Sequence, residues 1–253
     1  MWVPVNYLAG VFKEHMAACI LVVIGLATRL PFLSMSLDEV DSGNFYNALK
    51  YGYDIVNFRP HAPGYPLYVF LGWLLNHIVR DYLTSFTLLS AVLGSLCVVP
   101  FHLILKQIVG LKIAFCTSLL FLVNPLYWAF SETALADVPA VFFATLSVWL
   151  MYRGMTARNY YMAACFVTGL AIGIRQANIT FTLLLVFAGV YAYFYLKGDA
   201  LKQIGLGIAL FVTGIALWFL PAIFLGTGGL SEYIEATSQQ WNNVVSVSDA
   251  SNL

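Results

Sequence analysis

The chain has 253 residues and no net charge at neutral pH, and it is 61% hydrophobic but only 9% charged. Soluble domains carry about 25% charged residues, so this composition, with a mean hydropathy of +0.83, excludes an ordinary soluble domain. The sequence has no block of basic residues, so a nucleic-acid partner is not expected.

Apolar runs long enough to cross a bilayer recur along the chain. A hydrocarbon core about 30 Å thick needs a helix of about 20 residues. The predicted fold class is therefore all-α: a polytopic membrane protein with about seven transmembrane helices, plus juxtamembrane helices in the first outer loop. The predicted spans cover residues 16–33, 86–105, 113–130, 138–152, 161–174, 179–196 and 205–225.

Two apolar runs need a choice between interpretations. The run 16–33 is also compatible with a cleaved signal peptide, but it is long for one and lacks an Ala-x-Ala site, which favours a retained span. The run 67–79 is too short to span comfortably. It suits a helix that lies in or re-enters the membrane.

The distribution of charge supports this topology. If the N-terminus is inside and 67–79 does not span, seven basic residues fall on the cytoplasmic side, as the positive-inside rule requires. They are Lys13, Lys106, Lys112, Arg153, Arg158, Lys197 and Lys202. Ten acidic residues fall outside, namely Asp38, Glu39, Asp41, Asp54, Asp81, Glu132, Asp137, Glu232, Glu235 and Asp249. All of these but Asp81 lie in a first outer loop (34–66), a second outer loop (131–137) or a polar C-terminal segment (226–253). The predicted organisation is a single transmembrane module, 1–253.

The first outer loop begins with the acidic pair Asp38 and Glu39. Ser36 and Glu39 also fit a capping box, so Glu39 is either a helix cap or a functional carboxylate. Residues 40–49 then fit a short amphipathic helix. Asp38 has no such structural reason, and an uncompensated carboxylate beside a membrane is costly. Asp38 is therefore the stronger candidate for chemistry.

The second outer loop repeats the acidic theme with Glu132 and Asp137. Asp137 precedes Pro139 near the start of a span, where the helix dipole favours a carboxylate, so capping is the alternative to a functional role. Arg175 ends the span 161–174 on the same side. It either anchors the helix at lipid headgroups or binds a phosphate through its planar guanidinium.

Three further candidates lie in the Pro- and Gly-rich part of the first outer loop. They are Arg59, His61 and Tyr65. A stiff, tightly turned loop of this composition is suited to hold side chains in a site. A lone histidine is more often structural, so His61 carries both interpretations.

In order and spacing, these motifs resemble the GT-C superfamily of membrane glycosyltransferases, and in particular the branch of protein O-mannosyltransferases and lipid A aminoarabinose transferases (glycosyltransferase family 39). The matching stretches are Leu37-Asp38-Glu39-Val40, His61-Ala62-Pro63-Gly64-Tyr65-Pro66-Leu67-Tyr68, Asn124-Pro125-Leu126-Tyr127 through Ala136-Asp137-Val138-Pro139, and Gly169-Leu170-Ala171-Ile172-Gly173-Ile174-Arg175. Ala62 departs from the second proline usual in this turn. The resemblance covers about residues 29–196.

The resemblance implies transfer of a sugar, with inversion, from a polyprenyl-phosphate donor to a hydroxyl of a protein, lipid or glycan acceptor. It implies an integral multi-pass protein of the cell membrane (plasma or inner membrane), with its site on the extracytoplasmic face. Asp38 would then be the general base, with Glu39 beside it. Glu39 and Asp137 would orient the acceptor or a divalent metal ion, for which Asp38 and Asp137 are the candidate ligands; no other cofactor is expected. Substrate binding would fall to Asp137, Glu132, Arg59, His61, Tyr65 and Arg175, the cations holding the lipid phosphate.

Members of the superfamily usually have more spans and often an outer C-terminal domain. We therefore expect the segment 226–253 to be incomplete. Two alternatives to an active enzyme stay open: a transporter or flippase of lipid-linked sugars, and a non-catalytic, truncated membrane partner. Transport sites lie near the bilayer midplane, whereas the acids of this chain lie at a predicted surface, which favours the enzyme.

Overall fold

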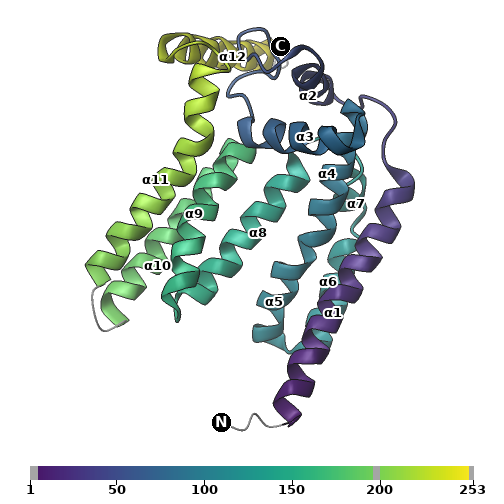
Figure 1. Cartoon of the computed structure of the whole chain (residues 1–253), viewed down its shortest axis with the longest axis vertical. Coiled ribbons are helices and arrows are strands. Elements are labelled where there is room, and N and C mark those ends of the chain that lie inside the picture. Colours follow the sequence, from purple (N-terminus) through teal and green to yellow (C-terminus); the bar gives the residue numbers. More distant parts are fainter. Residues whose placement is uncertain (1–4, 196–199, 251–253) are drawn as a thin grey trace.

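A computed structural model describes residues 5–195 and 200–250, and every regular element within them is helical (Figure 1). Most of the helices run side by side along the long axis of the molecule. They are α1 (Val5–Arg29), α4 (Tyr82–Leu96), α5 (Val98–Val109), α6 (Leu111–Leu122), α8 (Asp137–Gly154), α9 (Arg158–Ile174), α10 (Thr182–Tyr195) and α11 (Ala200–Phe224).

Two apolar segments of this bundle are long enough to cross a membrane by length and composition. They are Tyr82–Val109, which joins α4 to α5 over 28 residues, and α11 with 25 residues. Shorter apolar helices accompany them at Met16–Phe32, Pro66–Val79, Leu111–Leu122 and Gln176–Tyr191. The all-helical class is confirmed, and the number of seven spans stays a prediction.

Three helices lie across one end of the bundle, which we call the outer end: α2 (Val40–Tyr51), α3 (Pro66–Val79) and α12 (Leu230–Ala250) (Figure 1). The helix α3 has 14 residues and begins at Pro66, whose fixed φ suits the first turn of a helix. The run 67–79, which is too short to span a membrane comfortably, thus lies across the end of the bundle and not along its axis.

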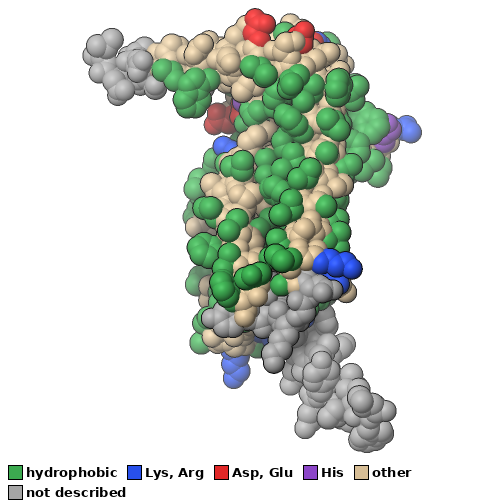
Figure 2. Space-filling view, turned by 90° about the vertical axis from the view of Figure 1, so that its left-hand side faces the viewer, with side chains coloured by type: hydrophobic (Ala, Val, Ile, Leu, Met, Phe, Trp, Pro, Cys, Tyr) green, Lys and Arg blue, Asp and Glu red, His purple; other side chains and the backbone are tan. Residues whose placement is uncertain are grey.

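The acidic side chains and one group of basic residues lie at opposite ends of the molecule. Space-filling side chains of Asp and Glu gather at the outer end (Figure 2). The turns that carry Lys106, Lys112, Arg153 and Arg158 lie at the opposite end (Figure 1). Lys197 lies outside the described residues. These four bases lie where the topology prediction places them, while Lys50, Arg59, Arg80 and Arg175 belong to the outer end.

The predicted span 113–130 is wrong as a single helix. The helix α6 ends at Leu122, and a short helix, α7 (Pro125–Phe130), begins after two intervening residues. The side chain of Asn124 accepts a hydrogen bond from the Tyr127 backbone N–H at 3.0 Å, which caps α7. Pro125 has no N–H to continue the previous helix. The predicted span 179–196 is likewise preceded by a 3₁₀ helix, η2 (Gln176–Phe181), and α10 begins only at Thr182.

A hydrophobic cluster beneath the outer end joins the crosswise helices to the bundle. Its buried residues are Phe45, Ala48, Tyr68, Val69, Phe86, Leu89, Ala134, Ala136, Ala140 and Ile174. These come from α2, α3, α4, the second outer loop, α8 and α9. Both outer loops are therefore packed on one core, which fixes their relative position.

The helices α9 and α11 approach each other closely through two glycines. A Cβ atom at Gly169 would lie 2.4 Å from the carbonyl oxygen of Phe211, and one at Gly214 would lie 2.5 Å from that of Phe166. Small residues allow this backbone approach between membrane helices.

Gly214→Ala is therefore expected to destabilise the protein by about 1–3 kcal/mol, the usual cost of overpacking. Gly205 on the same helix is the matched control, because a Cβ there meets nothing within 4 Å. Gly205→Ala should leave stability unchanged or raise it, since alanine is the better helix former. Unfolding of both variants in mixed detergent measures the difference, and equal stability would contradict the close crossing.

Candidate active site

The carboxylate of Asp38 is held by two serine hydroxyls. Ser34 Oγ donates to Asp38 Oδ2 at 2.5 Å, and Ser36 Oγ donates to Oδ1 at 2.6 Å. The backbone N–H of Ser34 in turn donates to the carbonyl oxygen of Glu132 at 2.9 Å. The two acidic loops therefore touch, and Asp38 is oriented from that contact while it stays exposed to solvent.

The predicted capping box at Ser36 is wrong. The helix α2 begins at Val40, and its N-cap residue is Glu39, whose side chain makes no capping hydrogen bond. Ser36 instead uses its hydroxyl on Asp38. The Glu39 side chain is exposed, so the capping alternative for it is removed and its predicted functional role stays a prediction.

His61 lies against the polar side of α2. Its Nδ1 is 3.5 Å from Asp41 Oδ1 and 3.4 Å from Asn44 Nδ2. The ring centroids of His61 and Tyr65 are 5.3 Å apart, and Tyr65 also meets Phe45 edge-on at 5.2 Å. Asp41 and Asn44 are three residues apart on α2 and so lie on the same face of the helix. This spacing is the feature of the sequence from which both residues could be predicted to act together.

Tyr65 connects this group with the second outer loop. Its backbone is left-handed, with φ of 45°, a strained conformation for a residue other than glycine. Burial raises the pKa of Tyr65; the charges of Asp41 and Asp137 act in the same direction, and Arg175 opposes them. The phenol therefore lies within the electrostatic reach of charges from three different segments.

Asp137 and Arg175 form an ion pair between α8 and the end of α9. Asp137 is the first residue of α8 and makes no capping hydrogen bond, while Arg175 directly follows Ile174 at the end of α9. Each side chain is about 40% exposed. The pair is thus positioned by two packed helices and open to a ligand on one side.

An apolar groove begins at this ion pair. It has a volume of about 640 Å³ and lies between α5, α8 and η2. Asp137 and Arg175 are its only charged lining residues. Its apolar lining includes Phe101, Ile104, Leu105, Val141, Val148 and Phe181. The groove therefore offers a charged end and a long hydrophobic wall.

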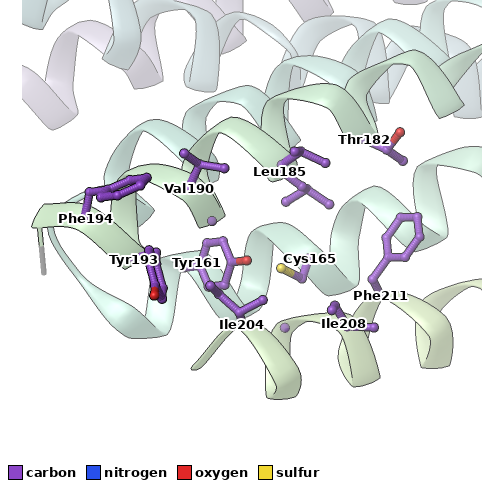
Figure 3. A pocket seen from close by; sticks show the side chains of 13 residues that line it. Tyr161, Cys165, Thr182, Leu185, Val190, Tyr193, Phe194, Ile204, Ile208 and Phe211 are labelled. Carbon is purple, nitrogen blue, oxygen red and sulfur yellow. The ribbon is translucent and has the colours of Figure 1, made fainter. Parts of the chain in front are cut away.

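A second apolar cavity, between α9, α10 and α11, has a volume of about 410 Å³ (Figure 3). Tyr161, Cys165, Leu185 and Phe211 are among its lining side chains, and none of the lining residues is charged. It lacks the groups that act on a phosphate or a hydroxyl, so we do not place the candidate site there.

Arg59 lies in a different place from His61 and Tyr65. Its guanidinium contacts Asp54 Oδ2 at 2.5 Å and donates to the carbonyl oxygen of Tyr51 at 3.0 Å. Burial acts to raise the pKa of Asp54, but hydrogen bonds from Asn57 and Arg59 and the Arg59 charge outweigh it, so this pKa is lowered. Arg59 is thus already neutralised, and its predicted role on a phosphate stays a prediction.

Arg29 is a buried cation that the sequence interpretation did not select. Its side chain is fully buried and donates to the carbonyl oxygens of Leu122 at 2.8 Å and Gly25 at 3.2 Å. Its guanidinium also lies 5.7 Å from the ring centroid of Tyr127. A charged residue inside an apolar run is a functional signal in membrane proteins, and here Arg29 ties the end of α6 to α1.

Glu132 lies beside this cation, and its side chain accepts a hydrogen bond from the indole N–H of Trp128. Burial raises the pKa of Glu132, and the Trp128 bond and the Arg29 charge offset this only in part. A carboxyl group with a raised pKa in the folded state resists ionisation there more than in the unfolded chain.

The stability of the protein should therefore fall as pH rises from the ordinary Glu value of 4.5 through the raised value in the folded state. Glu132→Gln cannot ionise and should remove this part of the pH dependence. Unfolding midpoints measured between about pH 4 and pH 7 test it. Parallel curves for the two proteins would contradict the raised pKa.

Among residues 5–195 and 200–250, no three His, Cys, Asp or Glu side chains gather in a way that suits a metal ion. The proposed metal role of Asp38 and Asp137 is not supported by a donor cluster and stays a prediction.

Comparison with known families agrees with this arrangement. The family model described as dolichyl-phosphate-mannose-protein mannosyltransferase matches residues 60–226, more than half of the chain. The chain belongs to this mannosyltransferase family. It is a membrane protein of the GT-C superfamily, as its motifs indicate. None of the curated proteins matches it.

Among solved structures, the mannosyltransferase-family chain is similar to the crystal structure of the Archaeoglobus fulgidus oligosaccharyltransferase. In that structure the enzyme is tethered to an acceptor peptide. The TM-score is 0.58 at 15% sequence identity, and the match covers 92% of this chain but 35% of that one. The likeness shows the shared GT-C fold. The chain spans about a third of the length of that enzyme.

Proposed function

We propose that the protein is a glycosyltransferase that moves a sugar from a polyprenyl phosphate to an acceptor hydroxyl, with inversion, at the extracytoplasmic face of the cell membrane. The observation that carries this proposal is the Asp137–Arg175 pair at the end of the apolar groove of about 640 Å³. A lipid phosphate has the same two parts, an anionic group and a long hydrocarbon chain. Membership in the mannosyltransferase family supports the same chemistry.

In this proposal the isoprenoid chain lies along the apolar wall of the groove, and the phosphate meets Arg175. Arginine suits this role because its planar donors bind two phosphate oxygens at once. Binding exchanges part of the contact between Arg175 and Asp137 for contact with the phosphate. Tyr65 lies within the electrostatic reach of Asp137 and Arg175, and His61 packs edge-on against Tyr65. We assign both residues to the sugar or its phosphate.

Asp38 is the proposed general base. It takes the proton of the acceptor hydroxyl while the acceptor oxygen bonds to the anomeric carbon, and the bond between that carbon and the phosphate oxygen breaks. The electron pair leaves with the lipid phosphate, whose charge Arg175 stabilises. A single displacement inverts the anomeric centre. Ser34 and Ser36 hold the carboxylate in one orientation.

Glu39, Glu132 and Asp137 are the remaining acidic candidates. Glu39 follows Asp38 directly and is exposed, whereas Glu132 is partly buried with its side chain on Trp128. We therefore assign Glu39 to the acceptor and give Glu132 a supporting role, in which its backbone carbonyl holds Ser34. The acceptor itself is a protein, lipid or glycan hydroxyl.

The test is sugar transfer by the purified protein in nanodiscs, with a panel of dolichyl- and undecaprenyl-phosphate sugars and a mixture of peptide, lipid and glycan acceptors. Formation of a glycosylated acceptor with free polyprenyl phosphate supports the proposal. Donor that binds without being transferred would indicate a non-catalytic partner. Donor that crosses the bilayer unchanged would indicate a flippase.

A further inference from the structure

The helix α12 carries an apolar stripe on one side. Leu230, Ile234 and Trp241 are four and eleven residues apart, which places them on one face of a helix. Their exposed fractions are 54%, 57% and 69%. The opposite face carries Glu232, Glu235 and Gln239, all exposed. The helix is therefore amphipathic, although the segment 226–253 reads as polar by composition.

The place of α12 in the fold gives this stripe a direction. The helix lies across the outer end of the bundle (Figure 1). Where it leaves the body of the molecule, hydrophobic side chains lie on its underside, on the side of the bundle (Figure 2). The apolar side of α12 is therefore turned towards the bundle, and the acidic side is turned away from it.

The contacts of Tyr233 hold the helix in this orientation. Tyr233 is buried, its ring meets Phe219 of α11 edge-on at 5.5 Å, and its hydroxyl donates to the carbonyl oxygen of Pro63 at 3.2 Å. Leu220 and Phe224, in the last turn and a half of α11, are also exposed and apolar. Exposed apolar side chains therefore occur on both sides of the connection between α11 and α12.

A crevice runs along the same side of α12. It has a volume of about 440 Å³ and is lined by Tyr233, Ile234, Thr237, Ser238, Trp241 and Asn242. Its mixture of apolar and hydroxyl groups matches the boundary between acyl chains and headgroups, where tryptophan is enriched. The helix has three acidic residues and no basic one, so the match is to neutral or zwitterionic headgroups.

We propose that α12 lies in the membrane interface, with Leu230, Ile234 and Trp241 among lipid acyl chains and the acidic face in water. Such helices lie in the plane of the interface with their apolar face about 5–10 Å deep. This placement of α12 also affects the first outer loop. Tyr233 holds Pro63, and the N–H of Ile55 donates to the carbonyl oxygen of Gly226 at 2.8 Å. Lipid contact at α12 therefore fixes the segment that carries His61 and Tyr65.

Nitroxide labels on the two faces of α12 test the proposal. Cys97 and Cys165 are buried and Cys19 and Cys116 exposed, so a background with Cys19→Ala and Cys116→Ala leaves the introduced site reactive. Labels on Ile234→Cys and Trp241→Cys report the apolar face, and labels on Glu235→Cys and Gln239→Cys are the matched controls. In phosphatidylcholine nanodiscs, the ratio of oxygen to nickel-chelate accessibility should be about fivefold or more higher on the apolar face.

Equal, water-like ratios at all four positions would overturn the proposal. Low accessibility to both reagents on the apolar face would also overturn it, because protein and not lipid would then cover the stripe. A measurement without labels backs this result. Phosphatidylcholine with brominated chains should quench the fluorescence that Trp241→Phe removes from the unmodified protein. Quenching of that difference by aqueous acrylamide alone would contradict the lipid seat.

The link to the first outer loop has its own test. Ile234→Lys with Trp241→Lys should speed hydrogen exchange at the Ile55 amide by about tenfold. The two lysines remove α12 from the interface, so the hydrogen bond from Ile55 to Gly226 opens more often. Glu235→Lys with Gln239→Lys is the matched control on the opposite face. Equal exchange in the two proteins would show that the loop is held independently of lipid.

Discussion

Asp38→Asn is expected to lower kcat for sugar transfer by about 10²–10⁴-fold, the usual contribution of a general base. Asparagine keeps the shape of the side chain but cannot take the acceptor proton. The fold should survive, because Asp38 is exposed and its two partners are hydroxyl groups. One hydroxyl can still donate to the amide oxygen, and the other can accept from the amide NH2 group. Donor binding should be unchanged, since in the proposal Asp38 acts on the acceptor proton and Arg175 holds the phosphate. Single-turnover transfer and donor binding in nanodiscs measure the two effects separately.

Asp81→Asn is the matched control for this substitution. Asp81 is also exposed and belongs to the same end of the molecule, but it caps α4 by accepting from the Thr84 N–H at 2.8 Å. Asparagine is an equally good cap, so that variant should keep normal transfer. If Asp38→Asn transfers sugar at a near-normal rate, another carboxylate is the base. Asp41, which contacts His61, would then be examined first.

Ser34→Ala separates orientation from proton transfer at the same carboxylate. The variant removes one of the two hydroxyl donors to Asp38 but keeps the backbone contact between Ser34 and Glu132. A hydrogen bond to a charged carboxylate contributes about 1.5–3 kcal/mol. Ser36 still donates to Asp38, so kcat should fall by at most about 10–150-fold, less than the upper range expected for Asp38→Asn. A change in KM for the donor instead of kcat would contradict a role in positioning the base.

The crosswise position of α3 was predictable because two independent signals agreed. The run 67–79 is too short to span, and only a non-spanning run keeps Lys106 and Lys112 on the same side as Arg153. Asn124-Pro125 marks the break between α6 and α7 in the sequence, whereas the hydropathy of the surrounding run favours one continuous span. Local turn chemistry decided the structure there.

The candidate site was predictable in its composition but not in its pairings. Asp137 and Arg175 both lie at helix ends on one side, and only the packing of α8 on α9 joins them into a pair. The position of Arg59 in the loop suggests a phosphate ligand. Asp54, five residues away, instead pairs with Arg59 across a tight turn. The contact between Asp41 and His61 joins residues that are twenty positions apart. Contacts between segments this far apart depend on the tertiary fold and leave no local pattern.

Arg175→Gln is expected to weaken binding of polyprenyl phosphate by about 10–150-fold. This corresponds to the roughly 1.5–3 kcal/mol that a hydrogen bond to a charged group contributes. Glutamine keeps a donor but loses the charge and the two-pronged contact with phosphate oxygens. The substitution also leaves Asp137 without its partner at the entrance of the groove, which repels an anion further. Binding of dolichyl phosphate in nanodiscs measures the loss without requiring turnover.

Asp137→Asn distinguishes a phosphate site from a structural ion pair. If the pair only holds α8 to α9, both variants lose stability and donor binding together. If Arg175 binds the phosphate, Asp137→Asn removes a competing carboxylate and should leave donor binding equal or stronger, while Arg175→Gln alone weakens it. Arg80→Gln, which changes an exposed arginine at the end of α3, controls for the loss of one positive charge. Because both partners are about 40% exposed, neither loss leaves a deeply buried charge, so opposite effects on the donor would have to come from the site itself.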